Sequence, residues 1–505
     1  MNHLVIAPLL LPLITGIALI LLRGSANPLR RTLNVASTLA LAVVAAALVL
    51  QASDGSVQVY RLGDWPAPFG IVLVADRLAA LMVIITAVLA AAVLLHAVRG
   101  SDRDGRYFHV LFQLQLFGLN GAFLTGDLFN LFVFFEVLLI ASYGLLLHGG
   151  GPLRTRAGLH FVVINLVGST LFLFAVGALY GVLGTLNMAD LARQAAAVAP
   201  DDVGVVRAAG LLLFAVFALK AALAPMHLWL PGAYGNTSLP VAAMFAIMTK
   251  VGAYAILRVY SLVFGADGGP VAGLLDPWLL PLALVTVAVG TFGLLASRRL
   301  ALQAAHLVIV SAGTLLAAFG IGSDAAIAAG LYYLAHTTFA AAALFLLADI
   351  IGRARGDLHD NLVTGPVLPR TQLVGGLFLL SCITVAGIPP LSGFFGKLLI
   401  LQSSVNTPWV SWVFGVLLVT SLLGIMALAR SGSTLFFATD DRVATAPAPH
   451  NLDLVGVVSL VSAGIVLVVF ADPVYAFARD AAMQLLQPGD YIAAVLPGAA
   501  VGAAP

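Results

Sequence analysis

The sequence contains very little of what a soluble or secreted protein depends on. It has one cysteine, Cys382, and only 9% of its 505 residues are charged. A single cysteine excludes disulfides and any cysteine-ligated cluster or zinc site. The net charge of +2 lacks the basic excess of a nucleic-acid-binding protein. Two charged residue types are scarcer still, because Glu136 is the only glutamate and the only lysines are Lys220, Lys250 and Lys397.

Long apolar runs take the place of the missing charge. Hydrophobic residues make up 61% of the chain and the mean hydropathy is +1.07, values typical of a polytopic membrane protein. We therefore expect an all-α membrane protein with about 14 transmembrane helices. The first apolar run has no basic region before it and is too long for a signal peptide, so it is expected to be an uncleaved span. The expected spans lie near 3–22, 33–52, 72–98, 107–126, 127–148, 160–183, 203–224, 239–264, 278–296, 300–320, 325–352, 371–404, 409–437 and 452–471.

Prolines interrupt two of these apolar runs. Span seven breaks at Pro225, and span twelve breaks at Pro389 and Pro390. Proline removes a backbone donor, and in lipid the freed carbonyls must be satisfied by protein or by a water-filled cavity. The broken spans are five apart, and an odd offset gives the two units opposite topology, as in inverted repeats. The expected units are residues 1–106 with N-terminal helices TM1–3, 107–264 with the first inverted five-helix repeat TM4–8, 278–437 with the second repeat TM9–13, and 452–505 with TM14 and a C-terminal interfacial segment.

Arginine is distributed unevenly between two sets of loops. Loops after odd-numbered spans hold fifteen arginines, and the loops on the other side hold five, among them Arg258. The positive-inside rule then places the odd-numbered loops in the cytoplasm and both termini on the outer side. Arg77 belongs to neither set and is expected to pair with its neighbour Asp76.

All three lysines and the glutamate lie inside apolar runs, whereas the loops carry arginine and aspartate. Burial can bring the pKa of a lysine into a working range, but arginine stays charged. Glu136 lies nine residues after Asp127, about 13–14 Å along a helix and therefore near mid-bilayer. A bare carboxylate there is costly, so Glu136 is expected to pair with Lys220 on a neighbouring span. A static structural ion pair is the alternative.

The remaining lysines also lie near the membrane centre. Lys250 is ten residues past Pro240, with apolar or small residues on each side, so it cannot easily reach an interface by extending its side chain. Lys397 lies just past the second break. A lysine beside a broken helix is a candidate ion site.

Three histidines complete the candidate set. His336 is in the middle of span eleven and suits a proton relay near neutral pH, although a lone intramembrane histidine can equally make an interhelical hydrogen bond. His306, in span ten, is expected to be structural. His227, in the loop of the first break, is a candidate entry group.

These residues predict a path for protons across the middle of the membrane. A row of lysines with a glutamate beside one end is the pattern of proton transfer, but channels, symporters and antiporters share it, so the partner ion stays open. There is no Walker A motif, no HExxH and no glycine-rich motif between a strand and a helix. We therefore expect a transporter rather than an enzyme, with no cofactor and no metal site. The predicted path consists of Glu136, Lys220, Lys250, His336 and Lys397.

Several segments carry a resemblance to a known family. They are NLFVFFEVLLIASYGLLLHG, HLWLPGAY, MTKVGAYAILRVY, LYYLAHTTFAAAALFLLAD and GIPPLSGFFGKLLIL. They resemble the antiporter-like proton-translocating subunits of respiratory NADH:quinone oxidoreductase and of Mrp-type cation/proton antiporters, over nearly the whole chain. The chain is most similar to the family of D subunits of Mrp antiporters. Lys397 replaces the glutamate of one quinone-reductase subunit, and the long C-terminal extension of the large A subunits of Mrp antiporters is absent.

The resemblance implies a role for each residue of the path. Glu136 and Lys220 would be the coupled pair, Lys250 and His336 the central relay, and Lys397 the terminal site. It also implies other subunits of a membrane antiporter complex as partners, the bacterial plasma membrane as the location, and Na⁺ or another monovalent cation as the ion exchanged for protons. Two readings compete with this one: a proton-pumping subunit of a redox-driven complex, and a scaffold subunit that transports nothing.

The chain departs from its relatives at two places near the relay. Many relatives carry a lysine about one turn beyond the histidine of span eleven, and residues 337–343 contain none. Many also carry AYSSISHMG in span ten, where this chain reads AHLVIVSAG over 305–313. The relay would then depend more on His336 and water, with His306 as a partial substitute.

Overall fold

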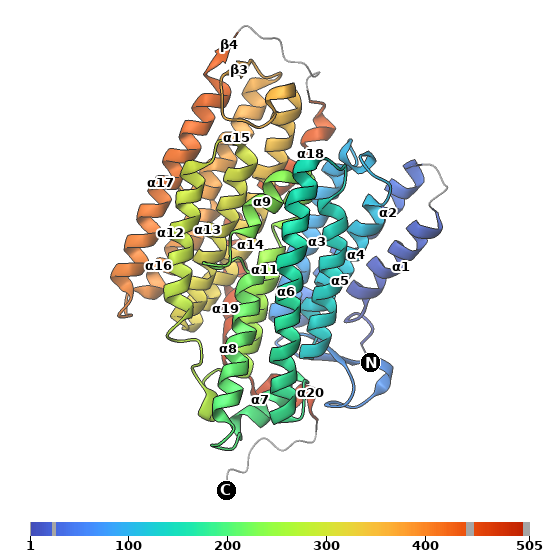
Figure 1. Ribbon diagram of the computed structural model, residues 1–505, viewed down its shortest axis with the longest axis vertical. Helices are drawn as coiled ribbons and strands as arrows, with labels where there is room; N and C mark the ends of the chain where they lie inside the picture. Colours follow the sequence, from blue (N-terminus) through green and yellow to red (C-terminus); the bar gives the residue numbers. More distant parts are fainter. Residues whose placement is uncertain (1, 23–26, 441–448, 498–505) are drawn as a thin grey trace.

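The computed structural model describes residues 2–22, 27–440 and 449–497, and most of them are helical (Figure 1). Because lipid offers the backbone no hydrogen-bond partners, an apolar chain forms helices that satisfy their own N–H and C=O groups. The α-helices of the described residues are α1 (Ala7–Leu21), α2 (Asn27–Ala52), α3 (Arg77–Ala97), α4 (Phe108–Leu124), α5 (Leu128–Leu146), α6 (Pro152–Leu183), α7 (Met188–Ala196), α8 (Val203–Lys220), α9 (Trp229–Asn236), α10 (Leu239–Phe245), α11 (Met248–Leu262), α12 (Leu279–Ala296), α13 (Leu300–Ile321), α14 (Asp324–Ala354), α15 (Thr371–Ala386), α16 (Ser392–Ser404), α17 (Val410–Phe436), α18 (Asn451–Val469), α19 (Ala471–Leu486) and α20 (Gly489–Val495).

Two small two-stranded sheets lie in the segments that connect the helices. Strand β1 (Gln58–Arg61) pairs antiparallel with β2 (Val72–Ala75), with Gln58 opposite Ala75. Strand β3 (Gly365–Pro366) pairs parallel with β4 (Thr439–Asp440) at the end of the molecule where the arginine-rich loops lie (Figure 1).

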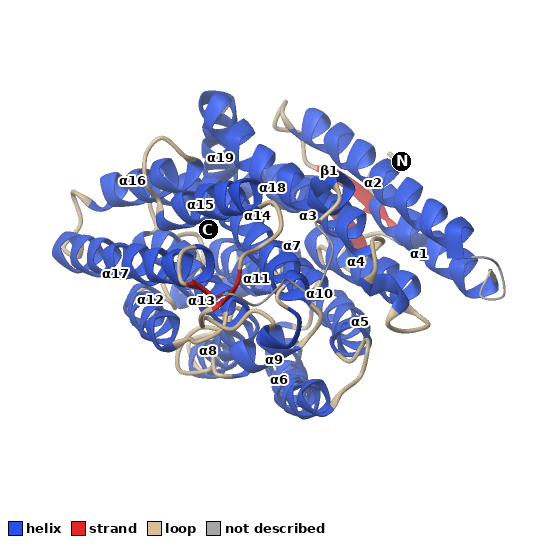
Figure 2. Cartoon of the chain, turned by 90° about the horizontal axis from the view of Figure 1, so that it is seen from above, coloured by secondary structure: helices blue, strands red, loops and turns tan. Residues whose placement is uncertain are grey.

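The helices confirm an all-helical, multi-pass membrane protein. Within the described ranges, 11 helices are long and apolar enough to cross a membrane, with α10 and α11 counted together, and α1, α4 and α15 are shorter apolar helices. Seen from above, α11 and α14 lie in the middle, with α1 and α2 along one edge and α17 at the opposite side (Figure 2). The 31-residue α14 packs against α3, α13, α16, α18 and α19 and is almost entirely buried.

Both predicted breaks are present, and a third was not expected. Helix α8 ends at Lys220 and the chain resumes as α9 at Trp229, while α15 ends at Ala386 and α16 begins at Ser392. Span eight, expected to be continuous over 239–264, is instead interrupted by a two-residue turn between α10 and α11, directly before Lys250. No proline or glycine lies at that turn, so the sequence carries no signal for it.

The expected pairing of Asp76 with Arg77 is wrong. Asp76 caps α3 by accepting from the Ala79 N–H at 2.9 Å, and its carboxylate binds Arg258 at 2.6 Å. Arg77 pairs instead with Asp480 at 3.4 Å. The cap turns Asp76 away from its neighbour, and Arg258 reaches it from α11. Arg258 therefore lies in the buried core rather than in an outer loop, which leaves the arginine asymmetry in the same direction.

The C-terminal segment expected after TM14 contains the helix α19. It packs against α14 and α3, and its alanines at 478, 481 and 482 are buried in that contact. Its interfacial position stays a prediction, as do the limits of the four expected units. Residues 498–505 of the last unit lie outside the described residues.

Candidate functional site

Glu136 is held by a side chain from the neighbouring helix. Asp127 fixes the start of α5 by accepting from the Asn130 N–H at 2.8 Å, which places Glu136 in the third turn. The Glu136 carboxylate accepts a hydrogen bond from the Ser169 hydroxyl of α6. Glu136 is half-buried, so only part of its side chain is in contact with protein.

Lys220 is buried and binds the same helix. At the C-terminal end of α8, its ammonium donates to Asn165 Oδ1 at 2.9 Å and lies 6.0 Å from the centroid of the Phe135 ring, beside Glu136 in sequence. Asn165 and Ser169 are four residues apart, so they share one face of α6. No ion pair within 4 Å joins Glu136 and Lys220 in the described residues, and each binds its own polar side chain of α6. Their coupling stays a prediction.

The first break is satisfied largely by neutral side chains. The Leu219 carbonyl, next to Lys220, accepts from the Trp229 indole N–H at 3.1 Å. The Ala224 N–H donates to Thr286 Oγ1 of α12 at 2.9 Å. Since these contacts bind the backbone near Pro225, the Lys220 ammonium is free to turn toward α6.

Lys250 lies at the centre of the molecule and is fully buried. Its ammonium donates to Ser311 Oγ of α13 at 3.0 Å. Two residues later, Gly252 lets α11 approach the end of α8, because a Cβ at this position would lie 2.8 Å from the Lys220 carbonyl carbon. The two lysine backbones are thus close, although no hydrogen bond joins the two side chains within the described residues.

A small enclosed cavity connects the second half of the predicted path. Its volume is about 30 Å³, enough for one or two water molecules. His336 lies on its wall, and its Nδ1 is 2.9 Å from Ser392 Oγ at the start of α16. The polar residues around the cavity are Thr291, Ser311, Thr314, Tyr333, His336, Thr337, Lys397, Thr420 and Ser421.

Lys397 binds its own broken helix. Its ammonium donates to the Ala386 carbonyl at 2.9 Å and to Ser421 Oγ of α17 at 3.0 Å. Pro390 stands four residues after Ala386 and has no N–H for that carbonyl. Gly387, with φ of 80°, ends α15 in the left-handed conformation that favours glycine. The break therefore supplies the oxygen that holds the lysine.

The two accessory histidines lie apart from these contacts. The His306 Nδ1 lies 2.8 Å from the Leu302 carbonyl and 3.2 Å from Ser297 Oγ, and its ring packs against Gly293. This local packing fits the structural role expected of His306. His227 lies in the loop between α8 and α9 with a buried Nδ1 atom, and its role as an entry group stays a prediction.

An open basin of about 1170 Å³ lies at the end with the arginine-rich loops. Asp349, near the end of α14, lines it and binds both His96 Nε2 at 2.8 Å and Arg353 at 2.5 Å. No group of three or more His, Cys, Asp or Glu residues suited to a metal occurs in the described part of the chain.

Sequence reasoning found the ionisable residues and missed their neutral partners. The structure brings the predicted residues into two clusters, one around Glu136 and Lys220 and the other around Lys250, His336 and Lys397. Polar residues spaced by one turn in an apolar span, as in Asn165 and Ser169, were a usable signal. The missed partners are Asn165, Ser169, Ser311, Ser392 and Ser421.

The chain is similar in sequence to proteins of a known family. The family model described as "NADH:quinone oxidoreductase/Mrp antiporter, TM" matches residues 125–424. The chain is 41% identical to the D subunit of a probable K⁺/H⁺ antiporter of Rhizobium meliloti, covering 97% of this chain and 96% of that protein. It is 37% identical to the D subunit of an Na⁺/H⁺ antiporter of Alkalihalophilus pseudofirmus, covering 98% and 100%.

Solved structures show the same fold. A chain of the Mrp complex from Dietzia sp. superposes with a TM-score of 0.86 at 27% identity, covering 98% of this chain and all of that chain. A chain of respiratory complex I from Thermus thermophilus has a TM-score of 0.76 at 24% identity, covering 96% and 99%, and shows the fold alone. The chain is thus a transporter subunit rather than an enzyme, and it belongs to the family of D subunits of Mrp-type antiporters, which is related to the antiporter-like membrane subunits of NADH:quinone oxidoreductase.

Proposed function

We propose that this subunit moves protons along Glu136, Lys220, Lys250, His336 and Lys397 in exchange for a monovalent cation. The observation that carries this proposal is the enclosed cavity that the Lys250 partner Ser311 shares with His336 and Lys397. Two groups able to hold a proton, His336 and Lys397, line this small space, and Lys250 reaches its wall through Ser311. Water in it would complete the connections between them.

The first cluster would load the path. Glu136 and Lys220 bind Ser169 and Asn165 on one face of α6. A proton on Glu136 removes the negative charge near Lys220, which then holds its own proton less firmly. The close backbone approach at Gly252 places the next lysine within reach of small side-chain movements.

Charge repulsion would drive the proton onward. Two ammonium groups in a low-dielectric interior disfavour each other, so the protonation of one lysine promotes proton release from the next. His336 stands on the cavity wall between Lys250 and Lys397 and can accept and donate a proton. Lys397 would pass the proton on when its ammonium leaves the Ala386 carbonyl.

The membrane arrangement is proposed to consist of about 14 crossings built around two inverted five-helix repeats. The 11 long apolar helices together with the shorter α1, α4 and α15 support this count. The breaks at the end of α8 and between α15 and α16 lie at corresponding places in the two repeats. The arginine-rich loops would face the cytoplasm of a bacterial cell, with both termini on the outer side.

The exchanged ion is proposed to be Na⁺. Relatives named for Na⁺ and for K⁺ both cover nearly the whole chain, so K⁺ is the alternative that must be measured. The path described above contains no cluster of oxygen ligands for a hard cation, which favours a cation route shared with other subunits of the complex.

The decisive experiment is an antiport assay of the complete complex in everted vesicles. A proton gradient is imposed without NADH or quinone, and its collapse is followed with a fluorescent pH probe after addition of NaCl, KCl or choline chloride. Collapse with NaCl or KCl but not with choline supports exchange. A response only with NADH and quinone would establish the redox-driven alternative, and full antiport in a complex carrying Lys397→Ala or Glu136→Ala would establish the scaffold.

A further inference from the structure

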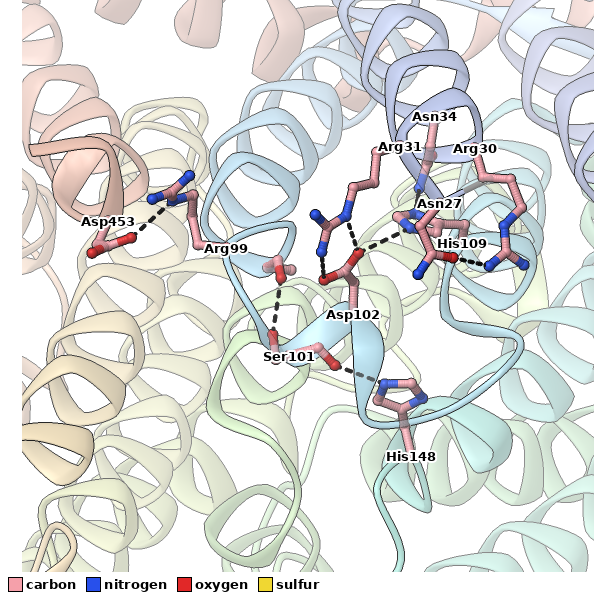
Figure 3. Close-up of polar contacts among 11 residues, drawn as sticks. Asn27, Arg30, Arg31, Asn34, Arg99, Ser101, Asp102, His109, His148 and Asp453 are labelled. Atoms are coloured by element: carbon pink, nitrogen blue, oxygen red, sulfur yellow. Dashed lines mark hydrogen bonds and ion pairs between the residues drawn. The ribbon is translucent and has the colours of Figure 1, made fainter. Parts of the chain in front are cut away.

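A second buried polar chain lies in the α1–α2–α4 part of the molecule, at the edge away from α12 and α17 (Figures 2 and 3). It runs from the α3–α4 loop into the helices through Asp102, His109, Asn34 and Gln113, and we call these four residues the Asp102 chain. Each of them is at least nine-tenths buried. None belongs to the proton path described above.

The outer end of the chain is a fixed carboxylate. Arg31 of α2 donates from Nε and Nη2 to the two Asp102 oxygens at 2.6 and 2.5 Å, and His109 Nε2 lies 3.2 Å from Oδ2 (Figure 3). Burial raises the pKa of the Asp102 carboxyl, but hydrogen bonds from His109 and Arg31 outweigh it and lower this pKa below its usual range. Asp102 therefore accepts hydrogen bonds and donates none.

This carboxylate fixes the direction of every bond behind it. His109 must carry its proton on Nε2, so its Nδ1 accepts from Asn34 Nδ2 at 2.7 Å. Asn34 Oδ1 then accepts from Gln113 Nε2 at 2.5 Å, and the same Gln113 nitrogen is 3.2 Å from Thr38 Oγ1. All donors point toward Asp102. The chain ends on Gln113 Oε1, a buried acceptor with no partner among the described residues.

A second proton on His109 would reverse these bonds. Nδ1 would become a donor, so Asn34 would have to turn its oxygen toward the ring. Its amide nitrogen would then face Gln113, which would have to present its own oxygen in return. The deep end would change from an oxygen acceptor to N–H donors. Neutral amides do not readily give up protons, so the chain passes on an orientation and not a proton.

We propose that His109 is a proton-binding site whose occupancy sets the orientation of Asn34 and Gln113 inside the α1–α2–α4 unit. The charged and titratable groups facing it are Arg31 from α2, Asp102 from the loop, and His148 at the end of α5. His148 is bound through Nε2 to the Ser101 carbonyl at 2.8 Å. At the depth of Gln113, α1 presents Gly16, whose Cβ position lies 3.7 Å from Gln113 Cβ.

Two features of the chain favour a switch over simple packing. A buried amide oxygen without a partner is destabilising, and an apolar residue in place of Gln113 would avoid that cost. A chain fixed at one end by an ion pair and unsatisfied at the other is also the arrangement that a single proton can reverse. The unpaired Gln113 Oε1 becomes a hydrogen-bonded oxygen in the reversed chain.

Helix α4 connects this site to the proposed path. The Phe123 carbonyl, near the far end of α4, accepts from Tyr254 Oη at 2.7 Å, and Tyr254 lies one turn after Lys250 on α11. Proton binding at His109 would thus make antiport sensitive to pH on the arginine-rich side. This last step rests on the proposed function, whereas proton binding and amide reversal do not.

The direct test is nitrogen NMR of the complete complex in lipid vesicles, with ¹⁵N-labelled histidine and glutamine. As the sample is taken from about pH 8 to about pH 5, the His109 Nδ1 signal should change from acceptor to N–H, and the Gln113 amide signal should move with it. The His148→Gln variant, which removes the neighbouring histidine, should leave both changes in place. A His109 that keeps one protonation state over this range, or a Gln113 signal that stays fixed while His109 titrates, overturns the proposal.

The variant Asn34→Asp separates proton binding at His109 from the reorientation of Gln113. A carboxylate at position 34 offers only acceptors, so His109 should carry both protons at pH 7 while Gln113 keeps donating and its signal stays constant with pH. A Gln113 signal that still changes with pH in this variant would contradict the relay. Antiport is measured in parallel, and a loss of its pH dependence with NMR signals still titrating would count against the link to transport alone.

Discussion

The two broken helices solve the same backbone problem with different partners. At the first break the Leu219 carbonyl accepts from the Trp229 indole, so Lys220 turns to a side chain on α6. At the second break the Ala386 carbonyl has no such partner, and the Lys397 ammonium itself binds it. A lysine therefore completes one break, while a neutral indole completes the other.

This difference assigns the two lysines different tasks. The position of the Lys220 ammonium depends on the neighbouring helix α6. Its partner Asn165 shares a helical face with Ser169, the partner of Glu136. The position of the Lys397 ammonium depends on its own broken helix, because moving it leaves the Ala386 carbonyl at the break without a hydrogen bond. The first end of the path is thus tuned by another helix, and the second by the geometry of α15 and α16.

The largest effect is expected from removing either ammonium. Lys220→Ala and Lys397→Ala should each reduce antiport by about a hundredfold or more, because the proposed path has each group carry the proton at one of its ends. Vesicle assays of the intact complex measure this loss, with subunit assembly checked by co-purification. Ser403→Ala is the matched control on α16, since its hydroxyl bonds only within its own turn. Normal antiport in both lysine variants would refute the path.

A smaller and asymmetric effect is expected from the neutral partners. Asn165→Leu removes the hydrogen-bond acceptor of Lys220 and should lower antiport about tenfold, the factor that corresponds to a hydrogen bond to a charged group. Ser421→Ala leaves Lys397 on the Ala386 carbonyl and should cost about threefold or less. Antiport rates of the two variants, measured in vesicles prepared in the same way, test this prediction. Equal losses would show that the two breaks are equivalent.

Trp229→Phe should make the first break resemble the second. Without the indole N–H the Leu219 carbonyl keeps its backbone bond from the Ala222 N–H at 3.2 Å but loses its side-chain donor, so Lys220 can turn to it and away from Asn165. Antiport should fall about three- to fivefold, in line with the loss of one neutral hydrogen bond. In the double variant with Asn165→Leu the losses should be less than additive. Strictly additive losses of antiport would show that Trp229 acts independently of the contact between Lys220 and Asn165.

The smallest effect concerns stability at a site away from both breaks. Asp102→Asn should lower the free energy of unfolding by about 1.5–3 kcal/mol at pH 7, because it weakens hydrogen bonds to a charged partner. The folded-state pKa of Asp102 is lowered, so its contribution is present above the unfolded value near pH 4 and is lost as the pH falls through the folded value. Thermal unfolding of the purified complex at pH 7 and at about pH 3, below the unfolded value, measures this. A difference that grows in acid would contradict it, and Asp104→Asn in the same loop is the control.

The spans and both proline breaks could be predicted from the sequence, because apolar runs of this length fit a membrane and a proline inside such a run interrupts the helix. The interruption between α10 and α11 could not be predicted, since Ala246 and Ile247 have ordinary helix-compatible side chains. The pairing of Asp76 could not be fixed either, because it depends on which helix lies beside the start of α3.

The ionisable residues of the site were visible because lysine and glutamate are so rare in this chain. Their partners were not, because serine, threonine and asparagine occur in many spans without a role and only the packing shows which of them face a lysine. The sequence also did not show that Glu136 and Lys220 each bind a polar side chain on the same face of α6, Ser169 and Asn165 respectively.

Helix α14 is longer than the membrane requires. Its 31 residues extend for about 46 Å, whereas the hydrocarbon layer is about 30 Å thick. His336, near its middle, and Asp349, on the basin wall, therefore lie on one continuous helix. A rotation of α14 that opens or closes the cavity would also move the Asp349 carboxylate against His96, so a change near His336 would alter the open basin as well.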